Sequence, residues 1–303
     1  MKVIAVQMGD RSRTTVRGRL LNDGRVRIAL GVLAGVALVA VFAPILAPYD
    51  PRLQLDVSHL QSQAPSFAHP LGTDTFSRDV LSRLIYGTRV SLTVALVAVA
   101  LSATFGTLLG AIAGYVGGWV DAILMRVVDA AFSIPAILLL IVVIALWGDI
   151  NVVTLTLLLA GVGWFTVSRL VRAETLAIRD ADYVVAARAL GASKWRILVR
   201  HVLPNAIGPA IVSATLSVGN IILLEAGLSY LGIGVRPPTP SWGNIIEEGA
   251  TRLSDVWWLT LFPGLAILVT VFACNALGEA LRDALDPRQL LPALDDAPIR
   301  MDG

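Results

Sequence analysis

Three polar side chains, Ser213, Ser217 and Asn220, recur at positions i, i+4 and i+7 of an otherwise apolar segment, and Glu225 follows further along. This spacing places the first three on one face of a helix. Hydroxyl and amide groups can hydrogen-bond a passing polar solute, and polar groups at membrane depth usually face a cavity or a partner. We therefore expect these four residues to line a translocation path, with hydrogen bonding between helices as the alternative.

The charged segment Asp180–Pro204 has the pattern of two short helices. Asp180 or Asp182 can cap the first helix, and Gly191 suits the left-handed position that follows a helix end, so we expect a helix over 182–190. Ser193 is suited to cap the second helix, and Pro204 should end it. The second helix has apolar and basic residues on opposite faces: Trp195, Leu198, Val199 and Val202 against Lys194, Arg196 and Arg200.

Small residues dominate the first of these helices, which contains Ala186, Ala187 and Ala189. Their lack of bulk allows the backbone of a partner protein to approach closely. The alternative is an amphipathic segment lying on the bilayer, but such helices usually carry large apolar anchors on the buried face. The pattern therefore favours a docking site for a partner protein.

Other kinds of chemistry find little support. The only lysines, Lys2 and Lys194, do not lie in a Gly-x4-Gly-Lys-Ser/Thr loop, so no phosphate-binding loop for ATP is present. His59, His69 and His201 lack neighbouring ligands at useful spacing, so we expect no metal site. The net charge of +2 argues against a nucleic-acid partner.

The composition indicates a membrane protein. The mean hydropathy is +0.74, with 56% hydrophobic and 15% charged residues in 303. A span needs about 20 apolar residues, and we expect Pro135 to be tolerated within one because neighbouring helices can satisfy freed backbone groups. Six segments meet this length: 28–47, 90–113, 123–147, 152–171, 207–232 and 256–278.

The domain organisation follows from these spans. We expect a tail at 1–27, a transmembrane domain at 28–288 and a second tail at 289–303. The tails and the loops on their side hold 18 of the 24 Lys and Arg residues. Because such residues favour the cytoplasmic side, both termini and the loop 180–204 should be cytoplasmic.

Several local expectations complete the picture. Apolar residues at helical spacing predict a short amphipathic helix at the membrane interface over Ser77–Tyr86. Trp257 and Trp258 should belong to an interfacial aromatic belt. Arg126 and Asp129, at i and i+3, should pair with each other.

Glycines also recur at intervals of four residues. Gly106, Gly110 and Gly114 form two such steps in the second span, and Gly31 and Gly35 form one in the first. This spacing permits close helix crossing, either as simple bundle packing or in a moving core.

The segment Asp180–Pro204 resembles the signature of ABC-transporter permeases: Glu-Ala-Ala, three residues, Gly, nine residues, Ile, one residue, Leu-Pro. Five residues fill their places: Ala186, Ala187, Gly191, Leu203 and Pro204. Val185 stands where the glutamate is expected, and His201 where the isoleucine is. Without the glutamate, an electrostatic contact to the ATPase would fall to Asp182 or Arg188.

Further matches run from about His69 to Arg288, and the ordered set is specific although each match alone is weak. They are His69-Pro-Leu-Gly-Thr-Asp74, Arg78-Asp79-Val-Leu-Ser-Arg-Leu-Ile-Tyr-Gly87, Gly114-Tyr-Val-Gly-Gly-Trp-Val-Asp121, Ser229-Tyr-Leu-Gly-Ile-Gly234, Pro237-Pro-Thr-Pro-Ser-Trp-Gly243 and Leu281-Arg-Asp-Ala-Leu-Asp-Pro-Arg288. The chain is thereby similar to the C-type permease of dipeptide, oligopeptide and nickel importers.

This resemblance implies an all-α, type I ABC importer permease fold in a bacterial inner membrane. It implies three kinds of partner: a homologous second permease, one or two ABC ATPase subunits and an extracytoplasmic substrate-binding protein. ATP and Mg would be bound by the ATPase subunits, so this chain would bind no cofactor and would not be an enzyme. The residues that would couple it to the ATPase are Asp182, Ala186, Ala187, Arg188, Gly191, Leu203 and Pro204.

The resemblance implies peptides as the substrate class, while nickel chelates or another small solute stay open. A secondary transporter driven by an ion gradient would often carry ionisable residues at mid-membrane and inverted repeats. The expected spans hold few charges and no clear internal repeat, which disfavours that class.

Overall fold

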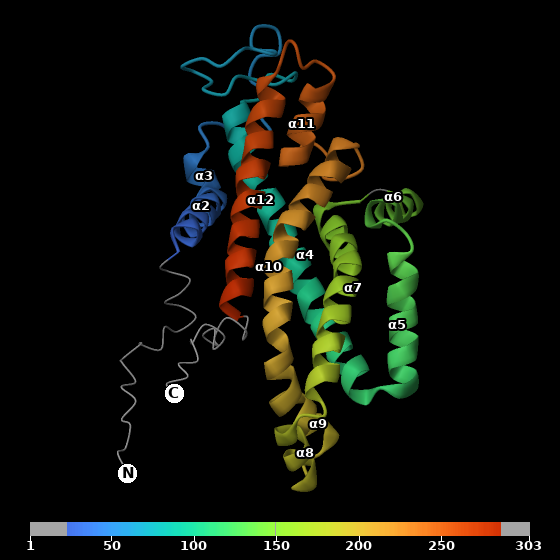
Figure 1. The fold of residues 1–303 in the computed structure, drawn as a ribbon. Helices are drawn as coiled ribbons and strands as arrows, with labels where there is room; N and C mark the ends of the chain where they lie inside the picture. The colour runs from blue at the N-terminus through green and yellow to red at the C-terminus, as the bar shows by residue number, and fades with distance from the viewer. Residues whose placement is uncertain (1–22, 149, 286–303) are drawn as a thin grey trace, which may run out of the picture.

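The computed structural model describes residues 23–148 and 150–285, so the expected tail 289–303 and most of 1–27 lie outside the described residues. Within them the chain is almost entirely helical (Figure 1), with an isolated bridge between Thr73 and Asp79 as the only β-pairing. The elements are α2 (Gly24–Val41), α3 (Ala43–Leu46), α4 (Val80–Val116), α5 (Gly118–Phe132), α6 (Ala136–Trp147), α7 (Val152–Ile178), α8 (Asp182–Ala189), α9 (Lys194–Ile197), the π-helical turn η1 (Leu198–Val202), α10 (Leu203–Tyr230), α11 (Trp242–Ala250) and α12 (Trp258–Leu285).

Five helical segments are long and apolar enough to cross a membrane: α2, α4, α7, the continuous stretch Lys194–Tyr230, and α12. The bent pair α5 and α6 makes a sixth if it is counted as one span. The predicted all-α protein with about six membrane-spanning helices is confirmed.

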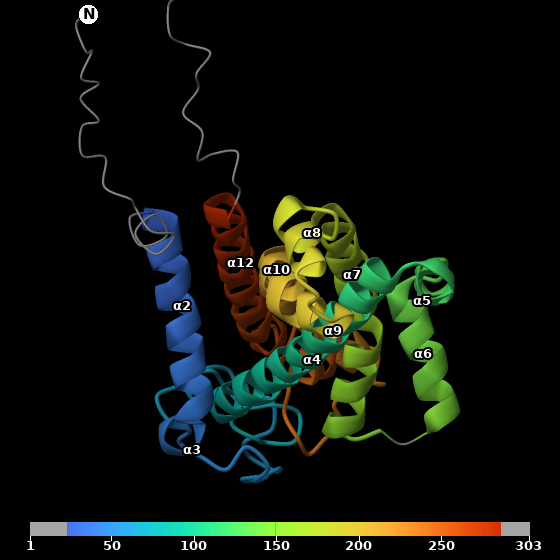
Figure 2. The same cartoon turned by 90° about the horizontal axis from the view of Figure 1, so that it is seen from below.

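The third expected span, 123–147, is wrong as a single straight helix, because α5 and α6 meet at an angle of 90°. Pro135 is the N-cap residue of α6. Proline has no N–H to donate and its ring clashes with a preceding helical turn. The helix therefore breaks at 133–135, and both halves stand beside α7 at the edge of the bundle (Figures 1 and 2).

The expected interfacial helix over Ser77–Tyr86 is also wrong, because α4 begins at Val80 and continues for 37 residues. Asp79 caps this long helix, accepting a hydrogen bond of 2.8 Å from the backbone N of Ser82. Arg83, in the first turn of this helix, is only 1% exposed. The first turns of α4 are therefore inside the fold and do not lie on a membrane surface.

The crossing of α4 and α7 depends on the glycines of α4. A Cβ built on Gly106 would lie 2.6 Å from Cβ of Val167, and one on Gly114 would lie 2.8 Å from Cβ of Thr175. Between them, a Cβ on Gly110 would collide with the carbonyl oxygen of Ser168. The predicted close helix crossing is confirmed here.

The glycine step of the first span behaves differently. A Cβ built on Gly31 or Gly35 would meet no atom within 4 Å. The same four-residue spacing therefore marks a tight crossing in α4 and open space in α2.

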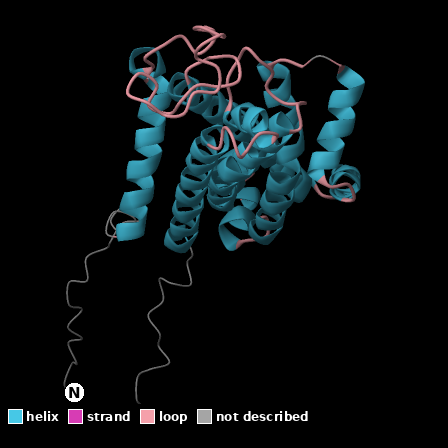
Figure 3. Cartoon of the chain, turned by 90° about the horizontal axis from the view of Figure 1, so that it is seen from above, coloured by secondary structure: helices cyan, strands magenta, loops and turns pink. Residues whose placement is uncertain are grey.

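The bundle has two distinct ends. The loops that connect α3 with α4 and α10 with α12 gather at one end together with α11, which we call the α11 end (Figures 1 and 3). Helices α8 and α9 form the opposite end, the α8 end, toward which the start of α2 and the end of α12 also point (Figure 1). The first and last described residues of the chain thus lie at the same end of the bundle as the segment 180–204.

Candidate functional site

Helix α8 matches the first predicted short helix closely. It spans Asp182–Ala189, and Gly191 follows at φ +82°. The predicted cap was wrong: Ala181 is the N-cap residue and no side chain caps the helix. Asp182 lies in the first turn, where its charge favours the positive end of the helix dipole.

The side chains of α8 divide into an inner and an outer set. Val184 is fully buried among apolar residues of α4, α7, α9 and α10, and Ala187 packs against the same cluster. Ala186 and Ala189 are exposed, and Leu190 is 89% exposed. The helix is therefore anchored in the bundle on one side, and its outer side presents Ala186 and Ala189 together with the larger Tyr183, Val185 and Leu190.

The second predicted helix begins as expected and does not end as expected. The Oγ of Ser193 accepts a hydrogen bond of 3.3 Å from the N of Arg196. The helix then continues through the π turn η1 into α10, so the prediction that Pro204 ends it was wrong. Pro204 lies in the first turn of α10, where its missing N–H is tolerated, directly after a turn with the wider π pattern.

The predicted apolar face of this helix is only half buried. Leu198 and Val202 lie in the core, whereas Trp195 is 65% exposed and Val199 is also exposed. Leu203 packs against the same cluster as Ala187. Helix α8 and the start of α10 therefore share one apolar cluster.

The turn at Gly191 gives a prediction. Replacing Gly191 by alanine should destabilise the turn by about 1–2 kcal/mol, because a Cβ in the left-handed region is strained even where no atom crowds it. The measurement is the rate of proteolysis within 180–193 in detergent, which should rise. Gly208→Ala is the control, because Gly208 lies inside α10 and a Cβ there also meets no atom within 4 Å.

Two ion pairs join α5 to α7 near the α8 end. Arg172 Nη2 lies 2.6 Å from Asp121 Oδ2, and Arg169 pairs with Asp129. The predicted pair of Arg126 with Asp129 is therefore wrong, because the helix that packs alongside offers a better-placed arginine. These contacts hold α5 against the bundle below the bend.

The polar residues of α10 do not all face the same space. Ser217 and Asn220 line a cavity of about 150 Å³ between α4, α7, α10 and the start of α6. Ser213 lies outside its lining and accepts, through its carbonyl oxygen, a 2.8 Å hydrogen bond from the Oγ of Ser217.

Glu225 lies in a different environment. It is fully buried and does not line this cavity. Its carboxylate accepts hydrogen bonds from the Oγ of Ser91 on α4, at 2.9 Å, and of Ser229, at 2.7 Å. The backbone N of Trp242 in turn donates to Ser91. Glu225 therefore ties α10 to α4 and to the start of α11.

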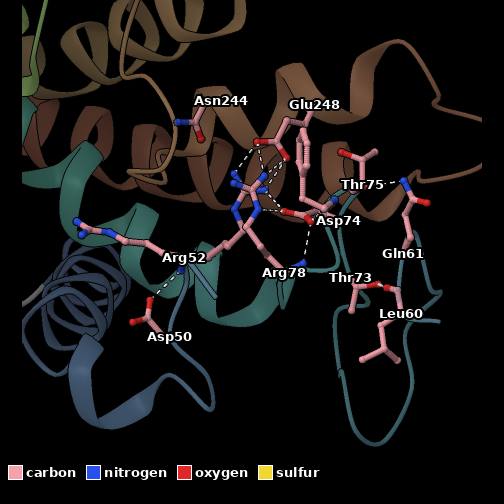
Figure 4. A network of polar contacts seen from close by, with 12 residues as sticks. Asp50, Arg52, Leu60, Gln61, Thr73, Asp74, Thr75, Arg78, Asn244 and Glu248 are labelled. Carbon is pink, nitrogen blue, oxygen red and sulfur yellow. Dashed lines mark hydrogen bonds and ion pairs between the residues drawn. The ribbon is translucent and has the colours of Figure 1, made fainter. Parts of the chain in front are cut away.

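A buried ionic network at the α11 end was not predicted (Figure 4). Arg83 donates to both carboxylate oxygens of Glu248, at 2.6 and 2.7 Å, and Arg78 donates to the same two oxygens at 2.9 and 3.0 Å. Asp74 accepts from Nε of Arg78 at 2.6 Å and also pairs with Arg83. Two positive and two negative groups thus balance, and none of the four side chains is more than 8% exposed.

Neighbouring contacts extend this network into the loop before α4. Nδ1 of His69 lies 2.9 Å from Oδ1 of Asp79. Trp258 is buried and its indole N–H donates to the carbonyl oxygen of Thr73 at 3.1 Å, so its predicted place in an aromatic belt is wrong. Trp257, 45% exposed, keeps a position compatible with that belt. For the ionic network, the one available sequence signal was a set of charged residues at the start of an apolar helix.

The fold and these sites define a polytopic helical membrane subunit with an anchored short helix at one end. Residues 106–290 match the family model described as the binding-protein-dependent transport system inner membrane component, and residues 15–65 match the N-terminal transmembrane domain of oligopeptide transport permease C. The chain belongs to this family of binding-protein-dependent transport permeases.

Curated relatives agree with that assignment. The chain is 40% identical over 269 residues to a glutathione transport system permease protein of Pectobacterium atrosepticum, covering 87% of each chain. It is 43% identical over 273 residues to a putative peptide transport system permease protein of Brucella abortus, covering 89% of this chain and 90% of the relative. A putative peptide permease protein of Brucella suis is 41% identical over 272 residues.

Proposed function

We propose that this chain forms half of the translocation pathway of an ATP-driven importer and couples to a separate ATPase through residues 180–204. The observation that carries the proposal is the two-sided packing of α8. Val184 and Ala187 fix the helix to the bundle, while Ala186, Ala189 and Leu190 are left outside. A partner seated on the outer side could therefore push on α10 through a continuous apolar core.

The proposed substrates are peptides. The names of the relatives in Pectobacterium and Brucella, which specify glutathione and peptide transport, support this choice. The solute would be delivered by a substrate-binding protein to the α11 end and would pass between this chain and a homologous second permease. Ser217 and Asn220 are the residues that we propose to line its path.

The proposed orientation places the α8 end and both termini in the cytoplasm of a bacterium. The excess of Lys and Arg on that side supports it. One or two ATPase subunits would bind there and would hold the ATP and Mg. Among the coupling residues, Arg188 and Asp182 are exposed on α8 and are available to a partner.

Ala186→Trp tests the coupling. We expect the variant to lose at least tenfold in peptide uptake by the purified complex in proteoliposomes, because the large side chain would hold the ATPase away from α8. ATP hydrolysis should no longer respond to substrate-loaded binding protein. Since Ala186 is exposed, the fold should persist, and the thermal midpoint of the isolated chain should not change.

Ala122→Trp is the matched control, an exposed alanine of α5 near the same end of the bundle. It should leave uptake and its coupling to ATP hydrolysis unchanged. If ATP hydrolysis is coupled to uptake equally well in the Ala186→Trp variant and in the native complex, α8 is not the docking element. Uptake that needs an ion gradient and not ATP would overturn the importer itself.

A further inference from the structure

Asn220 is an unsatisfied amide in a membrane-spanning helix. Its side chain is exposed and makes no hydrogen bond within the described part of the chain. It lies ten residues before the end of α10 at Tyr230, about 15 Å at 1.5 Å per residue. At that depth lipid offers no hydrogen bond and an unpaired amide is costly, so Asn220 must meet water, a solute or another protein.

The cavity beside Asn220 has a neutral polar wall. Its polar side chains are those of Ser102, Thr166, Ser217 and Asn220, and none of the charged residues that the structure describes lines it. The Oγ of Ser102 already donates to the carbonyl oxygen of Ala98 at 2.7 Å, and that of Ser217 donates to its own helix. Of these four, Thr166 and Asn220 make no hydrogen bond within the described residues, and Asn220 offers two N–H donors and a C=O acceptor.

The cavity has room for water or for part of a solute. Its volume of about 150 Å³ is well above the ~10–15 Å³ that one water molecule needs. A carboxamide can donate to a peptide C=O and accept from a peptide N–H.

We propose that Asn220 binds the main chain of the passing peptide, in a cavity whose neutral wall accepts side chains of either charge. The inference rests on the proposed peptide import. Selection among peptides then takes place elsewhere in the transporter, because a wall without charge neither attracts nor repels an ionised side chain.

The test introduces a charge at this position. In the reconstituted complex, ATP-dependent uptake is measured for three tripeptides whose middle residue is Lys, Ala or Glu, each at saturating concentration with the binding protein. Asn220→Asp should raise the ratio of Lys-peptide to Glu-peptide uptake about tenfold, because a carboxylate within a few ångströms strongly favours the cation in a poorly solvated space. Asn220→Leu should lower uptake of all three alike, and Asn220→Gln should restore part of it.

The control is Asn275→Asp. Asn275 is an exposed amide of α12 that lies beside Gly219 on another flank of α10 and does not line the cavity. Its variant should leave the charge ratio unchanged. Should Asn220→Asp fail to assemble, Thr166→Asp places the carboxylate on the α7 wall of the same cavity and must give the same shift.

The outcomes distinguish the proposed role of Asn220 from the proposed peptide import. An unchanged ratio in the cavity variants, or an equal shift in Asn275→Asp, overturns the role of Asn220 while peptide import stands. Loss of assembly with the second permease in Asn220→Leu, with no effect of the acidic variants on the ratio, would assign the amide to the subunit interface and also overturns it. Absence of ATP-dependent peptide uptake in the native complex overturns the proposed function instead.

Discussion

Replacing Gly110 by alanine should lower the free energy of unfolding by about 1–3 kcal/mol, the usual cost of overpacking a tight contact. The new Cβ would collide with the carbonyl oxygen of Ser168 and lie 3.0 Å from its Cα. Both are backbone atoms of α7, so no side chain can rotate away and the two helices must move apart. The higher helix propensity of alanine, about 1 kcal/mol, offsets only part of this loss.

The consequence should extend along the whole crossing. Gly106 and Gly114 approach α7 on either side of Gly110, because a Cβ built on them would lie 2.7 Å from the carbonyl oxygen of Trp164 and 2.9 Å from that of Arg172. Displacing the centre therefore loosens both flanks. The measurement is the thermal midpoint in detergent, together with the amount of chain recovered from membranes.

Gly35→Ala is the matched control for this experiment. Gly35 belongs to a four-residue glycine step in α2, yet a Cβ there meets nothing within 4 Å. The variant should be neutral or slightly stabilising, because alanine favours the helix. Equal destabilisation by Gly35→Ala and Gly110→Ala would show that the crossing of α4 and α7 is not the cause.

This contrast shows what the sequence can and cannot predict. Apolar length is a local property, and so are the glycine after α8 and the Ser193 cap, which is why these and the spans other than 123–147 were predicted well. Whether a glycine step is crowded depends on which helix lies against it. Gly35 and Gly110 have the same spacing pattern and different neighbours.

Ionic contacts were the least predictable feature for the same reason. Helical spacing paired Asp129 with Arg126, whereas α7 brings Arg169 to it. The network around Arg78 joins residues that are 170 positions apart in the chain. Such partners meet only after the helices have packed, so no local pattern contains them.

Polar residues of α10 illustrate a related limit. Ser217 and Asn220 share a cavity, as the helical face suggested, but Glu225 points toward α4 and the start of α11. Their spacing places residues on a helix face, and only packing decides which faces are filled. Along one helix, some polar residues thus line a cavity and another makes a contact between helices.

Glu248→Ala should be the most destabilising change at the α11 end, by about 3–5 kcal/mol. The substitution removes the acceptor of four hydrogen bonds from Arg78 and Arg83. Two buried guanidinium groups then share Asp74, which leaves one positive charge uncompensated. The loop before α4 and helix α11 should separate, and the thermal midpoint in detergent should fall.

Glu247→Ala is the matched control, since Glu247 is the preceding residue of α11 and is exposed. A surface substitution of this kind should change the free energy of unfolding by no more than about 0.5 kcal/mol. A comparable loss in the two alanine variants would attribute the effect to helix α11 itself and not to the buried charges.

The balance of charge also predicts whether a double substitution is more or less stable than the two single ones. Arg83→Met alone leaves two carboxylates with one arginine, and Glu248→Leu alone leaves two arginines with one carboxylate. The double variant Arg83→Met/Glu248→Leu keeps the pair of Asp74 and Arg78, which are 2.6 Å apart and neutral together. Because a buried pair can be replaced by apolar residues at much lower cost than one partner can be removed, the double variant should be more stable than either single one. Losses that simply add would mean that the four groups do not act as a balanced unit.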